Sequence, residues 1–312
     1  MVLKTVRIFF YVFVGVISME VTALADVSLD FYQYFDSQGV KIAYRTIGSG
    51  SALVLINGGP GRASDTFTDL ARDLSQITHR QVILFDQRGT GRSVVSPLDE
   101  TTISLDLMVN DLEALRVHLN LGKMDIIGHS FGGMYAMAYA AKFPKNVQSL
   151  ILSCSGGLDL SWMDYGQHII LARLSSKQVK QYKYWNSPEQ VDADPVRASL
   201  EALRVIVPAY VYRKKFVPQL EHDLVNLKYF NPSTNGLVWK SMKNLDLKVP
   251  LSAFGAPTLI IDGRQDLMGE AVPIAIHNVI KSSILVFLDE CVHYPWLDSP
   301  RRYFREIKTF LN

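Results

Sequence analysis

The sequence predicts an α/β fold with a mostly parallel sheet of eight strands, helices on its faces and a helical insertion after the sixth strand. Short apolar runs rich in β-branched residues alternate with helical patterns along most of the chain, as in parallel-sheet proteins. One stretch, residues 155–249, contains no clear buried strand and has the pattern of several helices. The length of 312 residues suits one large α/β domain or two small ones.

Eight strands are predicted from short apolar or alternating runs, namely residues 31–34, 41–45, 52–56, 81–85, 124–127, 147–153, 258–262 and 284–288. The first two alternate like an opening hairpin, with Ser37-Gln38-Gly39 as its turn. Helices are predicted between or after the strands, at residues 64–77, 104–119, 131–143 and 301–311. The insertion, rich in Tyr, Trp, Lys and Leu and broken by prolines, is predicted to be a cap over the site, with its aromatic residues forming mostly its own core.

The N-terminus predicts a secretory signal peptide. Lys4 and Arg7 precede an uncharged apolar run at residues 8–19, and Ala23-Leu24-Ala25 forms a small-x-small triplet. Twelve residues rise only about 18 Å as a helix, which is short of the roughly 30 Å hydrocarbon core. We expect cleavage after Ala25 and a periplasmic or extracellular protein, with an uncleaved membrane anchor or a buried N-terminal helix as the alternatives.

Composition excludes several classes of protein. A hydrophobic content of 48% is too high for a disordered chain, and a net charge of +2 gives no reason to expect a nucleic-acid partner. Two cysteines cannot build a disulfide framework or a four-cysteine zinc site. We expect a small-molecule or short-peptide substrate, no metal and no organic cofactor, and the sequence leaves the oligomeric state open.

A G-x-S-x-G motif predicts a serine nucleophile at Ser130. The motif, residues 128–132, directly follows a predicted strand and directly precedes a predicted helix, which is the context that a nucleophile elbow requires. The serine then stands at a helix N-terminus, where main-chain N–H groups favour developing negative charge.

A serine hydroxyl needs a base that is oriented by a carboxylate. In this motif's fold the acid and then the base follow the serine along the chain. Asp266 lies in the loop after the predicted strand at 258–262 and is the expected acid, whereas Asp262 is expected to be a structural turn residue. His293 follows the last predicted strand by a short loop and is the expected base. Neighbouring His129 is expected to pack beside the nucleophile.

Two glycine-rich loops follow predicted strands. The first, Asn57-Gly58-Gly59-Pro60-Gly61, is expected to supply an oxyanion hole through the main-chain N–H of Gly59, together with that of Phe131. The second, residues 86–93 (DQRGTGRS), lacks the G-x-x-x-x-G-K-[ST] pattern of a nucleotide site. We expect a structural loop there, tied by Asp86 and Arg88.

Taken together, these residues resemble the α/β-hydrolase superfamily over nearly all of residues 30–312, and within it the chain is most similar to the proline iminopeptidase group. The resemblance is carried by NGGPG at 57–61, DQRGTGRS at 86–93, GHSFGG at 128–133, the GRQD loop ending at Asp266, and His293 before an aromatic-proline pair. The group's first loop usually reads HGGPG, and Asn57 replaces the histidine here. The resemblance implies a catalytic domain of residues 26–154 and 250–312 with a helical cap at 155–249.

The resemblance also implies acyl-enzyme chemistry and the release of an N-terminal residue, preferably proline, from small peptides. Proline iminopeptidases hold the free amine with acidic side chains that include glutamates of the cap. Glu201 and Glu221 are the cap glutamates expected to bind substrate here, with Gly58 and His129 beside the nucleophile; a solvated helix face is the alternative for the glutamates. Esterase, lactonase or carbon–carbon hydrolase activity on the same machinery, and a non-catalytic binding protein, are the rival functions.

The two cysteines follow different predicted strands. Cys154 comes after the strand at 147–153, and Cys291 lies two residues before His293. In the family's strand order one strand separates theirs, which places them about two spacings, roughly 9–10 Å, apart. A disulfide needs Cα atoms within about 7 Å, so we expect free thiols unless the two loops bend together.

Overall fold

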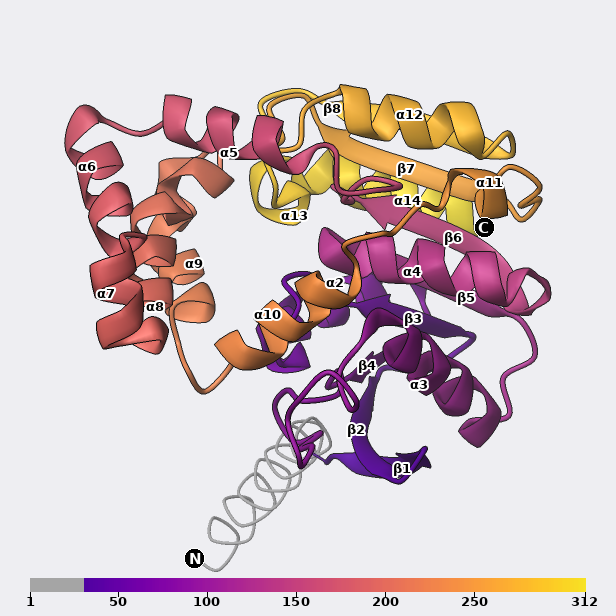
Figure 1. Cartoon of the computed structure of the whole chain (residues 1–312). Helices are drawn as coiled ribbons and strands as arrows, with labels where there is room; N and C mark the ends of the chain where they lie inside the picture. The colour runs from indigo at the N-terminus through magenta and orange to yellow at the C-terminus, as the bar shows by residue number, and fades with distance from the viewer. Residues whose placement is uncertain (1–30) are drawn as a thin grey trace, which may run out of the picture.

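The computed structural model describes residues 31–312 and contains one eight-stranded sheet (Figure 1). The expected signal peptide lies outside the described residues. None of the helices within residues 31–312 is long and apolar enough to cross a membrane. The sheet has the order β1-β2-β4-β3-β5-β6-β7-β8. Its strands are β1 (Gln33–Ser37), β2 (Val40–Ile47), β3 (Ala52–Ile56), β4 (Gln81–Phe85), β5 (Met124–His129), β6 (Val147–Ser153), β7 (Thr258–Gly263) and β8 (Ser283–Leu288).

The strand directions confirm the expected fold class. β1 and β2 form the predicted antiparallel hairpin, and β2 is also antiparallel to β4. Every pair from β4 to β8 is parallel. The hairpin turn places Gln38 at φ 51° and Gly39 at φ 80°. Positive φ at both central residues is the turn geometry that matches the twist of the flanking strands.

Alternating side chains of the central strands bury against two helical layers. Val54 and Ile126 pack with α3 (Leu105–His118) and α4 (Phe131–Lys142), which lie on one face together with α12 (Ala271–Val279). Their strand neighbours Leu53 and Ile127 pack on the opposite face with α2 (Thr68–Thr78) and α14 (Pro300–Leu311). The strands are therefore buried on both faces, which explains why their sequences are almost continuously apolar.

The chain between β6 and β7 is helical, where the sequence predicts a cap. Its helices are α5 (Met163–Ala172), α6 (Ser176–Trp185), α7 (Pro188–Ala193), α8 (Pro195–Ile206), α9 (Val217–Leu224), α10 (Pro232–Ser241) and α11 (Lys248–Leu251), with short 3-10 turns at Val207–Tyr210 and Lys214–Phe216. Helices α6 to α9 group together beside the sheet, at the left of Figure 1. Several begin with a proline in the first turn, a position where the missing N–H has no helical partner. The prolines that break the apolar pattern therefore start helices.

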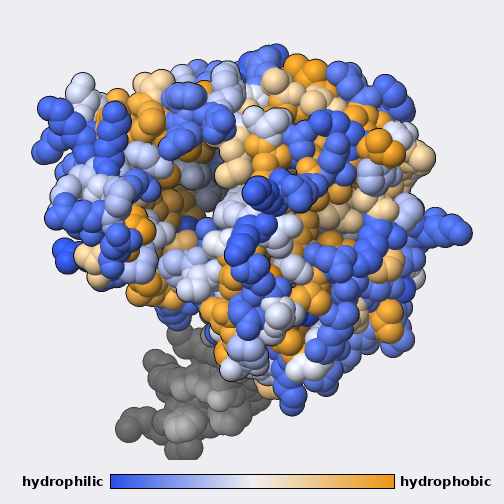
Figure 2. All heavy atoms as spheres, in the orientation of Figure 1, coloured by the Kyte–Doolittle hydropathy of each residue, from blue (hydrophilic) through white to orange (hydrophobic). Residues whose placement is uncertain are grey.

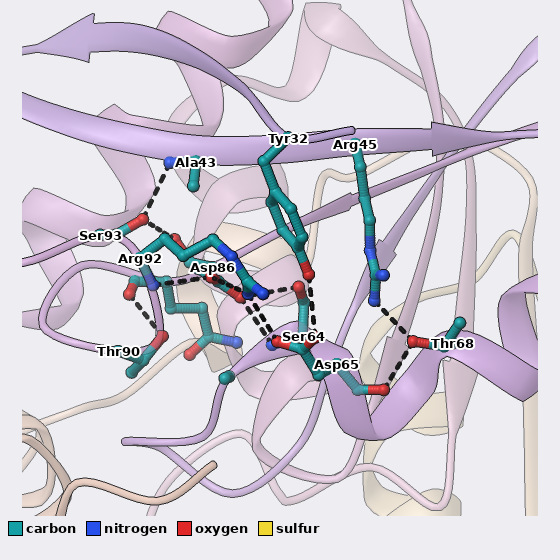
Figure 3. A network of polar contacts seen from close by, with 12 residues as sticks. Tyr32, Ala43, Arg45, Ser64, Asp65, Thr68, Asp86, Thr90, Arg92 and Ser93 are labelled. Carbon is teal, nitrogen blue, oxygen red and sulfur yellow. Dashed lines mark hydrogen bonds and ion pairs between the residues drawn. The ribbon is translucent and has the colours of Figure 1, made fainter. Parts of the chain in front are cut away.

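The loop at residues 86–93 is held by polar contacts (Figure 3). The buried Asp86 carboxylate accepts hydrogen bonds from the main-chain N–H and the hydroxyl of Ser64, at 2.9 and 2.7 Å, and from the N–H of Arg92 at 2.9 Å. Arg88 donates two hydrogen bonds of 2.6 Å to Asp111 of α3. Asp86 and Arg88 thus fasten the loop to its neighbours, as the sequence predicts.

Two helical features differ from the expectation. Helix α12 was not predicted, because its start at Ala271 carries no side-chain capping residue and Pro273 lies in its first turn. The helix predicted at residues 64–77 begins as a separate 3-10 turn, Ser64–Phe67, and becomes α2 only at Thr68. Short 3-10 turns of this kind are common at helix N-termini.

Candidate active site

Ser130 stands at a sharp turn between β5 and α4. Its backbone has φ 57° and ψ −123°, a strained conformation for a residue with a side chain. The two flanking glycines make the turn possible, because neighbouring main-chain atoms approach them too closely for any side chain to fit. A Cβ added to Gly128 would lie 2.3 Å from the carbonyl oxygen of Gly132, and one added to Gly132 would lie 2.2 Å from the carbonyl oxygen of Ile56. The G-x-S-x-G spacing is therefore a packing requirement of this turn.

His293 joins the serine to a carboxylate. Its Nε2 lies 2.9 Å from Oγ of Ser130, and its Nδ1 lies 2.9 Å from Oδ2 of Asp266. His293 and Asp266 are 3% and 2% exposed, so the contacts lie in a largely dry environment. The other Asp266 oxygen accepts the N–H of Met268 at 2.9 Å. The structure thus brings together the three residues predicted as a triad, although they come from the ends of three different strands.

Asp262 lies beside this carboxylate without touching the histidine. It is 2% exposed, and among the described residues its Oδ1 has no hydrogen-bond partner. Burial, together with the nearby Asp266 charge, raises the pKa of Asp262 well above its usual range. A raised pKa favours the neutral form of Asp262, and Asp266 is the carboxylate that contacts His293.

Two main-chain N–H groups flank the serine. Gly59 follows β3 with φ 64°, a conformation that favours glycine, and Phe131 is the first residue of α4. Neither N–H donates a hydrogen bond within residues 31–312. A Cβ on neighbouring Gly58 would lie 2.7 Å from Cβ of Ser130, so this loop packs directly against the elbow. Two unpaired main-chain donors beside a serine have the arrangement that can hold the oxygen of a carbonyl group under attack.

His129 is 1% exposed and lies among aromatic rings, including those of Phe67 and Trp296. Its Nε2 is 2.8 Å from the carbonyl oxygen of His293, so Nε2 carries the proton and donates it. Burial and the neighbouring His293 lower the pKa of His129 well below its usual range. His129 is therefore a neutral hydrogen-bond donor to the residue that touches Ser130; a contact with substrate stays a prediction.

A cavity of about 550 Å³ opens onto Ser130 and His293. Its walls come from the NGGPG loop, from the loop after β7 and from helices of the insertion, including Met163, Tyr182 and Trp239. In Figure 2 the molecule is hollowed between the lobe formed by α6 to α9 and the rest of the chain. The size is within the range of small-molecule sites, and most of the lining is apolar.

The expected cap glutamates lie outside this lining. Glu201 and Glu221 both pair with Arg204, Glu201 at 3.1 Å from Nε, and the two carboxylates are partly exposed. The acid that does line the cavity is Asp164 of α5. The structure pairs both carboxylates with an arginine and leaves them out of the cavity wall. A substrate-binding role for Glu201 and Glu221 therefore stays a prediction.

Two residues that line the cavity were not predicted from the sequence. Tyr210 of the insertion lies against His293, with ring centroids 5.6 Å apart, and its carbonyl oxygen accepts the N–H of His293 at 3.1 Å. Arg62 directly follows the NGGPG loop and lines the same cavity. The basic residue next to the NGGPG loop was a signal that the sequence did offer, whereas nothing in the sequence pairs residues 210 and 293.

One group of possible metal ligands occurs within residues 31–312. Cys154, Asp262 and Asp266 place one ligand atom each within 4.8 Å of one another, and all three are buried. The Asp266 oxygens already accept hydrogen bonds from His293 and Met268, and burial raises the pKa of the Cys154 thiol. Because metal ligands must be deprotonated, these groups fit the support of a histidine better than a metal centre.

The arrangement matches a known family. The sequence model of the α/β hydrolase fold family matches residues 51–300, and the chain belongs to this family. The proline iminopeptidase of Lactobacillus helveticus is 27% identical over 286 residues, covering 88% of this chain and 95% of the relative. That of Saccharolobus solfataricus is 29% identical over 276 residues, covering 86% and 87%.

Solved structures share the fold with other named activities. VinJ superposes with a TM-score of 0.74 at 18% identity, covering 90% of this chain and 98% of its own. Est816, described as an N-acyl homoserine lactone degrading enzyme, superposes with a TM-score of 0.68 at 19% identity, covering 89% and 100%. At these identities the likeness shows the fold alone.

Proposed function

We propose that the protein is a serine hydrolase that acts through an acyl-enzyme. Ser130 Oγ attacks a carbonyl carbon while His293 Nε2 takes its proton, and Asp266 holds the imidazole and stabilises its charged form. The N–H groups of Gly59 and Phe131 receive the oxyanion. His293 then gives the proton to the leaving group, and a water molecule repeats the sequence on the acyl-enzyme. The observation that carries the proposal is the contact of His293 with both Ser130 and Asp266.

For the substrate, we propose a small peptide or amide with an N-terminal proline or a similar residue. The support is the similarity to proline iminopeptidases over almost their whole length. The cavity volume also suits a small substrate. Asp164 is the carboxylate of the lining that could meet a free amine, a role that the sequence assigns instead to Glu201 and Glu221.

A second candidate is a carboxylic ester or lactone hydrolase on the same machinery. The observation that favours it is the pairing of Glu201 and Glu221 with Arg204, which occupies the carboxylates expected to hold an amine. If neither glutamate holds an amine, the apolar lining would select the substrate. Esters acylate a serine more readily than amides do, so an ester would then be favoured.

Two measurements test these proposals. A fluorophosphonate probe should label the wild type and leave Ser130→Ala unlabelled; absence of labelling in folded wild type would refute the serine mechanism. Proline 4-nitroanilide and 4-nitrophenyl butyrate, assayed in parallel, then separate the candidates. Release of nitroaniline supports the aminopeptidase, and ester turnover without nitroaniline release supports the second candidate.

For the location, we propose export, with residues 1–25 removed as a signal peptide. The support is the basic start, the apolar run and the small residues before Asp26. Expression of the full chain with a C-terminal tag in a bacterial host, followed by fractionation and N-terminal sequencing, tests it. A mature chain beginning at Asp26 in the periplasm is expected, and a cytoplasmic chain that retains residues 1–25 would contradict the proposal.

A further inference from the structure

Arg62 places a buried positive charge in the wall of the cavity. The residue is 6% exposed, and it directly follows the NGGPG loop at residues 57–61. A Cβ built on Gly59 would lie 2.7 Å from both Cδ and Nε of Arg62, so the side chain crosses directly over that loop. The same loop touches Ser130 through Gly58. The charge therefore sits beside the groups that would carry out acyl transfer.

The contacts of Arg62 are with uncharged groups. Nη1 donates to the carbonyl oxygen of Leu224, the last residue of α9, at 2.8 Å. The guanidinium also lies over the ring of Phe230, 4.5 Å from the centroid. Among the described residues, no carboxylate oxygen lies within 4.0 Å of its nitrogens. The carbonyl dipole and the aromatic ring reduce the cost of burial without cancelling the charge.

The other titratable groups that face Arg62 do not cancel this charge either. Burial lowers the pKa of Arg62, whereas the phenols of Tyr294 and Tyr210 and the carboxylate of Asp223 favour its charged form. Burial raises the pKa of Tyr210 to about 12 and raises that of Tyr294 as well, so both phenols are neutral at neutral pH. Asp223 pairs with His222 at 3.1 Å and lines a neighbouring cavity instead.

A buried, uncompensated guanidinium costs several kcal/mol, and the cost falls when a carboxylate binds it through two parallel hydrogen bonds. Arg62 has five N–H donors, of which one is used by Leu224. Within residues 31–312, neither Nε nor Nη2 of Arg62 has a hydrogen-bond partner. Neither atom is fully buried, and the side chain lines the cavity, so both atoms are accessible from it.

We propose that Arg62 is a specificity-determining residue that binds a carboxylate of the substrate next to the bond that is cleaved. This inference rests on the proposed serine hydrolase function and deepens it by naming the chemical class of substrate. A carboxylate can reach the site from two sources. It can belong to the leaving group, as in a free dipeptide, or to the acyl group, as in the half-ester of a dicarboxylic acid.

Two matched substrate pairs test the two sources. Prolylglycine against prolylglycinamide places or removes a carboxylate on the leaving group. Mono-4-nitrophenyl glutarate against 4-nitrophenyl pentanoate does the same on the acyl group, since a methyl replaces the carboxylate. We expect the wild type to prefer the carboxylated member of at least one pair by 30-fold or more in kcat/KM, roughly what a buried charge pair contributes.

Arg62→Gln should lower kcat/KM for the carboxylated member far more than for the neutral member, and so remove most of that preference. Arg62→Lys should restore part of the preference, because it keeps the charge without the planar fork. Arg302→Gln, which removes an exposed charge on α14, is the control and should behave like the wild type. Thermal unfolding and fluorophosphonate labelling verify that each variant is folded and that its serine reacts.

The outcomes separate this inference from the function on which it rests. If folded wild type is not labelled by the probe, the serine hydrolase function itself fails. If it is labelled but neither pair shows a preference, the carboxylate site is refuted alone. An equal loss on charged and neutral substrates in Arg62→Gln would also refute it, because it would assign Arg62 a purely structural role through Leu224. The pair that shows the preference identifies which side of the bond carries the carboxylate.

Discussion

The side chain of His129 donates a hydrogen bond of 2.8 Å to the main-chain carbonyl of His293. The main-chain N–H of His293 donates a hydrogen bond to the carbonyl oxygen of Tyr210 at 3.1 Å. The backbone of His293 is thus held on one side by the residue before Ser130 and on the other by the helical insertion. This arrangement lets the elbow and the insertion jointly fix the position of the imidazole.

We predict that His129→Phe lowers kcat about ten-fold with little change in KM. Phenylalanine keeps the aromatic packing but leaves the His293 carbonyl without its donor, and a small displacement of a catalytic group is expensive in rate. Steady-state kinetics on whichever substrate the enzyme turns over measures the effect. His129→Gln, which retains an N–H donor, should recover part of kcat; equal losses in both variants would show that packing, and not the hydrogen bond, matters.

His129 should also make the fold sensitive to acid. Its pKa in the folded protein lies well below the ordinary 6.5, so below pH 6.5 the unfolded state binds a proton that the folded state refuses. The free energy of unfolding therefore falls as pH decreases below 6.5, by up to about 1.4 kcal/mol per pH unit from this group. Urea unfolding of wild type and His129→Gln between pH 7.5 and 5 should show the two curves converging; parallel curves would contradict the prediction.

The sheet and the three residues at its edge were predictable, because each is encoded locally. Every strand except the hairpin is an apolar run, and Ser130, Asp266 and His293 each follow a strand whose position the pattern indicates. Carboxyl ends of parallel strands meet at one edge of the sheet, so chain order was enough to bring these side chains together.

The contacts that complete the site were not predictable, since they join the insertion to the sheet. The contacts of Tyr210 with His293 and of Arg62 with Leu224 join distant segments, and no local pattern reports them, although the place of Arg62 beside the NGGPG loop is visible in the sequence. Glu201 and Glu221 were chosen for their charge, and their actual partner is Arg204, which lies on α8 with Glu201, whereas Glu221 lies on α9. Charge on a helix indicates solvent or an ion pair as readily as it indicates a ligand.

Asparagine substitutions should distinguish the two acids near His293. Asp266→Asn is expected to lower kcat by about 1,000- to 10,000-fold, since an amide cannot stabilise the charged imidazole. Asp262→Asn is expected to keep kcat within about ten-fold, because His293 contacts Asp266 instead and the raised pKa of Asp262 favours its neutral form. Single-turnover acylation rates measure both; a larger loss in Asp262→Asn than in Asp266→Asn would exchange their assignments.

Asp262→Asn should in addition stabilise the fold at neutral pH. The raised pKa means that the folded state holds a proton that the unfolded state has lost above its ordinary pKa of 3.8, so stability falls as pH rises from that value toward the folded pKa. Asparagine removes this penalty of about 1.4 kcal/mol per unit of pKa shift. Thermal unfolding at pH 7 and pH 4 should show a gain that shrinks at the lower pH; a lower Tm at pH 7 would contradict this account.

The Arg88–Asp111 pair should behave as a buried ion pair. Both side chains are 2% exposed and are joined by two hydrogen bonds of 2.6 Å. Arg88→Met should lower the free energy of unfolding by about 3–5 kcal/mol, because it leaves a buried carboxylate uncompensated. The double variant Arg88→Met/Asp111→Leu should recover most of this loss in urea unfolding. A double variant as unstable as the single one would show that the loop needs the charges themselves.

The two thiols should be present but unreactive in the native protein. Cys154 and Cys291 are free and fully buried, and burial raises the pKa of both. Since the thiolate is the reactive form, Ellman's reagent should detect no thiol in the folded protein at pH 8 and two per chain in denaturant without reductant. Both sulfurs lie within 3.6 Å of the carbonyl oxygen of Val292, so the two loops bend toward each other although β7 separates β6 from β8. Detection of no thiol in denaturant would show that this approach ends in a disulfide.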